Sequence, residues 1–156
     1  MQKIVLILIG LTLTCFASGN YGEIGYKEAK RIHSAGSGLF IDARGAKFYK
    51  KGTILGAINI PLDRFKRMKR LLPNKQGSKI VIFCNGIECE KSAKLAKMIV
   101  DLGYSRVMVY KEGYPQWQKT GQEVMLSEAY CKSVPKIKRE VSIENTKVYL
   151  GSEKAQ

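Results

Sequence analysis

Histidine is nearly absent from this chain, and acidic residues are scarce. One histidine, His33, occurs in 156 residues, and 13 Asp and Glu side chains stand against 27 Lys and Arg. A single imidazole argues against a histidine-rich zinc site and against a Cys/His protease pair. His33 also falls in a predicted helix, far along the chain from Cys84, so we expect it on the surface of that helix and not as a catalytic base.

Long apolar runs are missing as well, apart from one stretch near the start of the chain. Ile4 to Phe16 is mainly apolar, follows a charged segment at 1–3 and precedes small residues at 17–19. This order is typical of a secretory signal peptide. Thirteen residues are too few to cross a bilayer comfortably, so a permanent anchor is the weaker alternative, and lipidation of Cys15 is weaker still. We predict that 1–18 is a signal peptide, that the protein is periplasmic or secreted, and that it has no stable membrane insertion after cleavage.

The formal net charge of +14 indicates an acidic partner surface or a polyanion. Export argues against nucleic acid as that partner. The densest basic stretch, 64–72, carries Phe65, Met68 and Leu72 at helical spacing. Because this apolar stripe covers only two turns, we expect a short helix packed on the core with a solvated basic face, in preference to a helix lying on a membrane.

Short apolar runs alternate with helical patterns along the rest of the chain. Apolar strands joined by helices predict an α/β fold of three layers, in which a central, mostly parallel sheet is covered by helices on both faces. We predict one domain at 24–123 and a C-terminal extension at 127–156 that is partly packed and frayed at its end. The expected strands are 39–42, 57–60, 80–83 and 107–110, the expected helices are 26–35, 64–72, 91–102 and 116–119, and 44–52 is expected to be a loop.

Cys84 is the strongest candidate for a reactive residue. It ends the predicted strand 80–83, and the predicted helix begins at Lys91 after a short loop. Backbone N–H groups of such a loop and the start of a helix both favour a thiolate over a thiol. Open parallel sheets also place their sites at the C-terminal ends of strands. A buried, inert cysteine is the plain alternative, since free cysteine is often a core residue.

Three stretches in order make the chain resemble a single-domain rhodanese, and the resemblance covers about residues 24–123. They are Phe40–Arg44 with Gly52–Pro61, then Val81–Cys84, and finally Val109–Trp117. The resemblance implies a rhodanese-like fold and a sulfurtransferase in which Cys84 takes up a sulfane sulfur as a persulfide. It also implies that loop amides stabilise the charged sulfur, and that no metal and no organic cofactor are needed.

The loop after Cys84 departs from the usual pattern of that family. Carboxylates at Glu88 and Glu90 would repel an anionic donor if they faced inward, and we expect them to face outward near the helix start. A phosphatase on this fold is a further alternative, since such enzymes resemble a cysteine-led loop with an arginine six positions after the cysteine. This chain has Glu90 at that position, which argues against a phosphatase. The substrate or anion loop is predicted to comprise Asn85, Gly86, Ile87, Glu88, Cys89, Glu90 and Lys91.

Cys89 lies five residues after Cys84 and is a possible redox partner for it. Two pairings remain open, Cys84 with Cys89 or Cys89 with Cys131. Asp42 and Arg44 match family positions that we take as structural supports for the loop after their strand, with direct substrate contact as the weaker alternative. Trp117 is expected in the core, and Gly86 is expected to supply a backbone shape that other residues disfavour.

The predicted function is that of an exported sulfurtransferase. Its donor would be thiosulfate, a polysulfide or a protein persulfide, and its acceptor a thiol or another nucleophile, with a protein acceptor among the options. The alternative is a non-catalytic or thiol/disulfide redox-switching module that uses the same fold to bind a partner.

Overall fold

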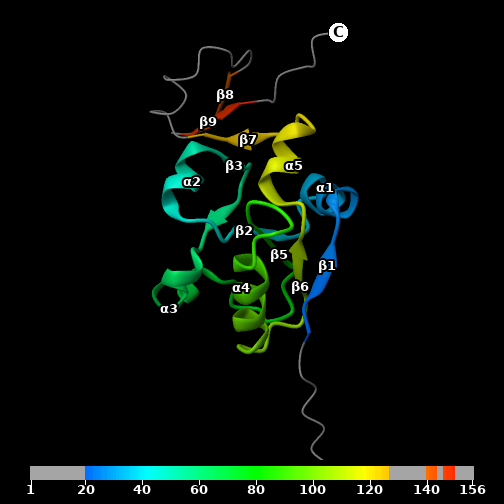
Figure 1. Cartoon of the computed structure of the whole chain (residues 1–156), viewed down its shortest axis with the longest axis vertical. Helices are drawn as coiled ribbons and strands as arrows, with labels where there is room; N and C mark the ends of the chain where they lie inside the picture. The colour runs from blue at the N-terminus through cyan, green and yellow to red at the C-terminus, as the bar shows by residue number, and fades with distance from the viewer. Residues whose placement is uncertain (1–19, 127–139, 144–145, 150–156) are drawn as a thin grey trace, which may run out of the picture.

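The computed structural model describes residues 20–126, 140–143 and 146–149. Its main sheet has five strands in the order β1-β6-β5-β2-β4, and every neighbouring pair is parallel (Figure 1). Because β5 is the middle strand, its C-terminal end is flanked by strands on both sides. The strands are β1 (Gly22–Ile24), β2 (Leu39–Asp42), β4 (Ile58–Asn59), β5 (Ile80–Phe83) and β6 (Val107–Tyr110).

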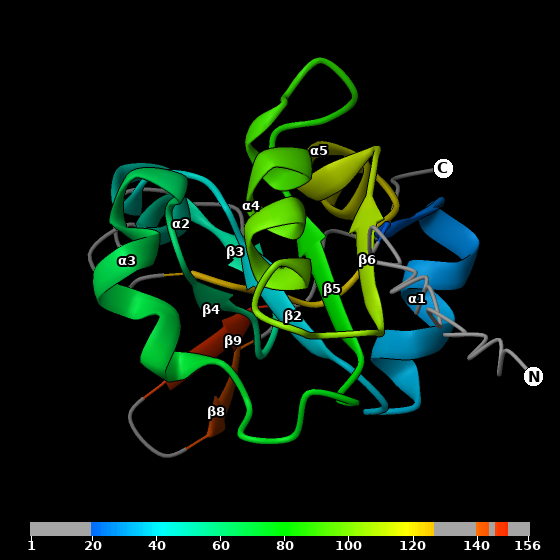
Figure 2. The ribbon, with the colours of Figure 1, turned by 90° about the horizontal axis from the view of Figure 1, so that it is seen from below.

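Helices cover both faces of this sheet. On one face α1 (Tyr26–Ser34) and α5 (Gly113–Lys119) pack into one apolar cluster, and on the other α3 (Phe65–Met68) and α4 (Lys91–Val100) pack into a second. Figure 2 shows α4 crossing the sheet in front of β5. The predicted α/β fold with a mostly parallel central sheet and helices on both faces is therefore confirmed. No helix in the described ranges is both long and apolar enough to span a bilayer.

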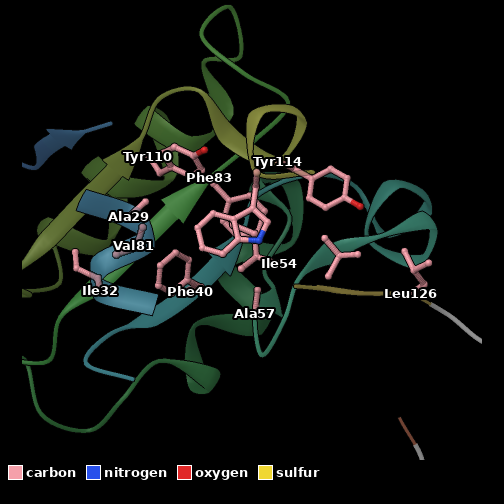
Figure 3. Close-up of a cluster of buried hydrophobic side chains, with 12 residues drawn as sticks. Ala29, Ile32, Phe40, Ile54, Ala57, Val81, Phe83, Tyr110, Tyr114 and Leu126 are labelled. Atoms are coloured by element: carbon pink, nitrogen blue, oxygen red, sulfur yellow. The ribbon is translucent and has the colours of Figure 1, made fainter. Parts of the chain in front are cut away.

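Strand β5 shows why the central strands read as unbroken apolar runs. All four of its residues are fully buried, with Val81 and Phe83 in the α1/α5 cluster and Ile80 and Ile82 in the α3/α4 cluster. Successive side chains of a strand point to opposite faces of the sheet. Because helices cover both faces here, the strand is apolar at every position and does not alternate between apolar and polar residues. Figure 3 shows Val81 and Phe83 among the side chains of the α1/α5 cluster.

A second, antiparallel sheet was not expected from the sequence. Its order is β3-β7-β9-β8, formed by β3 (Thr53–Ile54), β7 (Val124–Met125), β8 (Glu140–Ile143) and β9 (Thr146–Tyr149). Two of these strands come from the predicted extension and pair with the domain through β7. The rest of that extension and the predicted signal peptide lie outside the described residues.

Two expectations for local structure were wrong. The expected loop 44–52 contains α2 (Ala46–Lys51), a six-residue helix without a buried residue, which is too short and too polar to show a helical apolar period. The expected helix 64–72 is divided into η1 (Leu62–Arg64), α3 and η2 (Lys69–Leu71). Its apolar stripe nevertheless packs inward as predicted, because Phe65 and Leu72 are buried.

Candidate active site

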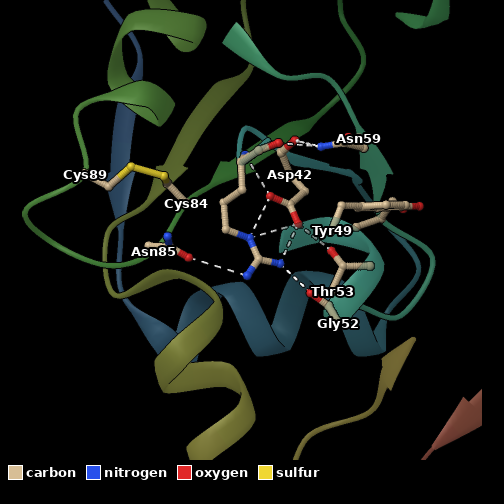
Figure 4. A network of polar contacts seen from close by, with 10 residues as sticks. Asp42, Tyr49, Gly52, Thr53, Asn59, Cys84, Asn85 and Cys89 are labelled. Atoms are coloured by element: carbon tan, nitrogen blue, oxygen red, sulfur yellow. Dashed lines mark hydrogen bonds and ion pairs between the residues drawn. A yellow bond between two sulfur atoms is a disulfide. The ribbon is translucent and has the colours of Figure 1, made fainter. Parts of the chain in front are cut away.

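Cys84 lies at the C-terminal end of the central strand and is joined to Cys89 by a disulfide (Figure 4). Their Cα atoms are 6.1 Å apart. Of the two pairings left open by the sequence, the structure contains Cys84 with Cys89. Cys84 is 2% exposed, whereas Cys89 is only half-buried. In this state Cys84 is neither ionised nor open to solvent, so the expected nucleophile exists only once the disulfide has been reduced.

The loop between the two cysteines is held by its own backbone. The amide of Cys89 donates a hydrogen bond to the Gly86 carbonyl at 3.0 Å, so that amide is engaged within the loop. Gly86 has φ +116°, a conformation that disfavours any residue with a side chain, as predicted for this position. Ile87 is 65% exposed, and Asn85 is exposed as well. The loop enclosed by the disulfide therefore exposes the apolar side chain of Ile87 to solvent.

The acidic side chains of the loop face outward, as expected. Glu88 is exposed, and the Glu90 carboxylate is 75% exposed and accepts a hydrogen bond from Lys94 Nζ at 2.6 Å. This hydrogen bond, and then the charge of Lys94, lower the pKa of Glu90 below its ordinary value. Lys91 is exposed at the first position of α4. Neither carboxylate is buried against the sulfur atoms, which removes the main electrostatic objection to an anionic donor.

The β6–α5 junction supports Cys84 from the side and was missed at the level of sequence. The Tyr114 amide donates to the Cys84 carbonyl at 2.9 Å. Gly113 has φ +62°, and a Cβ added there would lie 2.3 Å from the same carbonyl oxygen and 2.9 Å from the Gly86 nitrogen. Only glycine allows this approach of the two backbones. A glycine three residues after the end of a strand was the available signal, but its partner is about 30 residues away in sequence.

Asp42 and Arg44 form a buried ion pair next to this loop (Figure 4). Asp42 is fully buried, Arg44 is 4% exposed, and Arg44 Nη2 lies 2.7 Å from Asp42 Oδ2. The Thr53 hydroxyl donates to the same carboxylate at 2.8 Å, and the guanidinium also donates to the Gly52 carbonyl. Its carbon lies 4.2 Å from the centre of the Tyr114 ring. The charges are thus paired and hydrogen-bonded, as buried charges must be.

The same guanidinium reaches the cysteine loop. Arg44 Nη1 donates to Asn85 Oδ1 at 3.5 Å, which connects the ion pair to the residue directly after Cys84.

The side-chain amide of Asn59 donates to the backbone carbonyls of Asp42 and Arg44 at 2.9 and 2.8 Å. Burial, and then the Asp42 charge, raise the pKa of the nearby Tyr49. Asn59 was missed, although a polar residue inside an otherwise apolar run was the signal for it.

Comparison with known proteins places this architecture in a family. Residues 26–120 match the family model described as rhodanese-like domain. The chain belongs to the rhodanese-like family. Among solved structures, the domain resembles the BH2092 protein from Bacillus halodurans at 27% identity and a TM-score of 0.60, covering 68% of this chain and 77% of that one. It also shares the fold of the rhodanese-like domain of an Anabaena protein, at 17% identity, a TM-score of 0.61 and coverage of 78% and 89%.

Curated relatives are longer than the matching region. The tRNA uridine(34) hydroxylase of Acinetobacter baylyi is 32% identical over 111 residues, which are 67% of this chain and 34% of the relative. The chain therefore spans about a third of the length of the curated relatives that it matches first.

Trp117 belongs to the core of this rhodanese-like domain, and the His33 ring packs against it. The His33 ring is half-buried, its Nε2 lies 2.8 Å from the Leu55 carbonyl oxygen, and its centre lies 4.9 Å from that of Trp117. His33 lies in α1 as expected but is only partly exposed, because its ring packs edge-on against Phe40 and Trp117. Trp117 is 1% exposed, as predicted. Within the described ranges no group of three or more His, Cys, Asp or Glu residues is arranged to hold a metal ion.

Proposed function

We propose that the protein is an exported sulfurtransferase whose nucleophile is Cys84 after reduction of its disulfide. The thiolate attacks the sulfane sulfur of a donor, the donor's remaining fragment leaves with the bonding electrons, and a Cys84 persulfide forms. An acceptor thiol then attacks the outer sulfur and frees Cys84. The donor is thiosulfate, a polysulfide or a protein persulfide.

One observation carries this proposal: Cys84 ends the central parallel strand of a rhodanese-like domain, beside the start of α4. A helix start favours an anionic sulfur, and the carboxylates of the loop point away from it. Export rests on the predicted signal peptide, and we propose no nucleic-acid partner.

Sulfur loading can be followed directly by intact mass. The reduced protein is incubated with thiosulfate or polysulfide under anaerobic conditions and examined for the mass of one added sulfur atom that a thiol reductant removes. We expect Cys84→Ser to gain none. Loading of that variant to the level of wild type would contradict the assignment of Cys84, and cell fractionation with and without 1–18 tests export.

The disulfide itself favours a second candidate, a redox-switching binding module. A domain whose Cys84 stays 2% exposed and bonded to Cys89 would bind a partner without accepting sulfur. Counting free thiols in the unreduced protein, before and after a mild thiol reductant, separates the two. A disulfide that resists such a reductant favours the binding module.

Hydroxylation of tRNA is not proposed for this chain. The curated hydroxylases share 32% identity or less with it, and the chain covers about a third of their length. The shared part is the rhodanese-like domain, and a shared fold alone does not transfer an activity.

A further inference from the structure

Sulfur transfer through Cys84 alone does not require a second cysteine, yet Cys89 is bonded to Cys84 in this structure. Its sulfur reaches bonding distance of Cys84, across a loop that closes through the Cys89–Gly86 hydrogen bond. We propose that Cys89 discharges the Cys84 persulfide as hydrogen sulfide. This inference rests on the proposed function and adds a product to it, because sulfane sulfur leaves as sulfide instead of moving to an external acceptor.

The step is balanced without any added reagent. The Cys89 thiolate attacks the inner sulfur of the Cys84 persulfide, the bond between the two sulfur atoms of the persulfide breaks, and hydrosulfide leaves with the electron pair. A disulfide between Cys84 and Cys89 forms at the same time. The sulfane sulfur is reduced to sulfide and the two cysteine sulfurs are oxidised, and the hydrosulfide takes a proton from water when the pH requires it. The covalent product is the disulfide that the structure contains.

Proximity gives this internal attack its advantage. The two Cα atoms are 6.1 Å apart, and the loop between them holds Cys89 near Cys84. An internal nucleophile so placed acts at an effective concentration that a dissolved acceptor cannot match. The Ser92 hydroxyl donates to the Cys89 carbonyl at 3.4 Å, which further ties Cys89 to the first turn of α4.

Regeneration then needs an external thiol, and burial determines where that thiol attacks. Cys84 is 2% exposed and Cys89 is half-buried, so an external thiol reaches Cys89 more easily than Cys84. Attack there expels Cys84 as the thiolate, which is the form that takes up the next sulfur. A second thiol releases Cys89. Each cycle therefore converts one sulfane sulfur and two thiols into one hydrogen sulfide and one external disulfide.

A single-turnover experiment tests this inference. The parent protein is the full chain with Cys15→Ser and Cys131→Ser, compared with the same chain carrying in addition Cys89→Ser, Cys89→Ala or Cys84→Ser. Each is reduced, freed of reductant under anaerobic conditions and given thiosulfate or, in a second arm, polysulfide. Sulfide above the amount seen with Cys84→Ser is measured together with intact mass, and circular dichroism verifies folding.

We expect the parent to release one sulfide per loaded protein and to finish two hydrogens lighter than the reduced form. Both Cys89 variants should retain the added sulfur and release sulfide roughly 100-fold more slowly. A parent that keeps its persulfide as long as the Cys89 variants would overturn the inference and leave the sulfurtransferase proposal intact. Rapid release from the Cys89 variants would also overturn it. Failure of every chain to load sulfur would instead remove the proposed function, and the inference with it.

Discussion

The guanidinium of Arg44 donates to three residues and lies against the ring of a fourth. Its acceptors are the Asp42 carboxylate, the Gly52 carbonyl and the Asn85 side chain, and the aromatic partner is Tyr114. Two of these partners belong to segments that touch the Cys84 backbone or directly follow it. A lysine could not reproduce the arrangement, because a single ammonium lacks both the planar fork and the stacking surface.

Replacing Asp42 should therefore be costly. In Asp42→Asn the guanidinium keeps its burial but loses its counter-charge, and we expect the free energy of unfolding to fall by about 3–5 kcal/mol. Urea denaturation measures this change. Glu28→Gln is the matched control, since it removes an exposed ion pair with Arg31 and should leave the unfolding midpoint unchanged within error. Equal effects of the two substitutions would contradict the structural role assigned to the buried pair.

The unequal burial of the two cysteines predicts which one takes up an external thiol. The oxidised protein is exposed briefly to limiting glutathione, quenched with iodoacetamide and fragmented by tandem mass spectrometry. We expect glutathione on Cys89 and the alkylating group on Cys84, because Cys89 is the more exposed of the two residues. Glutathione found mainly on Cys84 would show that the loop opens before exchange.

At the scale of elements, the β6–α5 junction holds the end of β5 in place. Gly113→Ala puts a methyl group onto the Cys84 carbonyl and into a left-handed backbone conformation at the same time. Gly56→Ala is the matched control, because Gly56 has φ +75° and open space around it. The control should lose about 1–2 kcal/mol of stability from backbone strain alone, and Gly113→Ala should lose more.

Chemical denaturation compares the two alanine variants, and the rate at which dithiothreitol reduces the disulfide provides a second measurement. We expect faster reduction only in Gly113→Ala, since only that substitution displaces Cys84. Identical behaviour of the two variants would mean that the junction does not position the sulfur.

Elements that are covered on both faces could be predicted from the sequence, and short or distant ones could not. The limits of β2, β5 and β6 agree with the expected strands because each is a continuous apolar run. β1, β3 and β7 have two or three residues and leave no period to detect. Cys84 was identified from its place after a strand and Cys89 from its spacing. Gly113 and Asn59 act on residues far away in sequence, which no local pattern reveals.

Two segments of the molecule are rich in exposed positive charge. Figure 1 shows α2 and α3 along the same edge of the molecule, apart from each other. The exposed cations of α2 and of residues 64–70 are Lys47, Lys50, Lys51, Arg64, Lys66, Arg67, Lys69 and Arg70. The solvated basic face expected for 64–72 is thus confirmed. The exposed Phe48 of α2 lies within the same group of residues.

Stability of the whole domain should fall in alkaline solution. Burial, and then the charge of Glu112, raise the pKa of Tyr110 well above its ordinary value, and Tyr49 is shifted in the same direction. A raised pKa stabilises the fold while both states are protonated. As pH rises above about 10, the unfolded tyrosines ionise while the folded ones do not, so stability declines.

Tyr110→Phe tests this cause. Its hydroxyl has no hydrogen-bond partner among the described residues, so the variant should match wild type near neutral pH. Between pH 9 and about 11 its melting temperature should decline less steeply than that of wild type. Thermal unfolding followed by circular dichroism gives both curves, and parallel curves would assign the alkaline loss to other groups.

The pairing of a sheltered sulfur with a more accessible one has a practical consequence for anyone who purifies this protein. Air oxidation would join Cys89 to Cys84, and a sample stored without reductant would then transfer no sulfur in an assay that contains no thiol. Its inactivity would reflect how the preparation was handled and say nothing about the catalyst. Thiol-free buffers should therefore follow, and never replace, a reduction step.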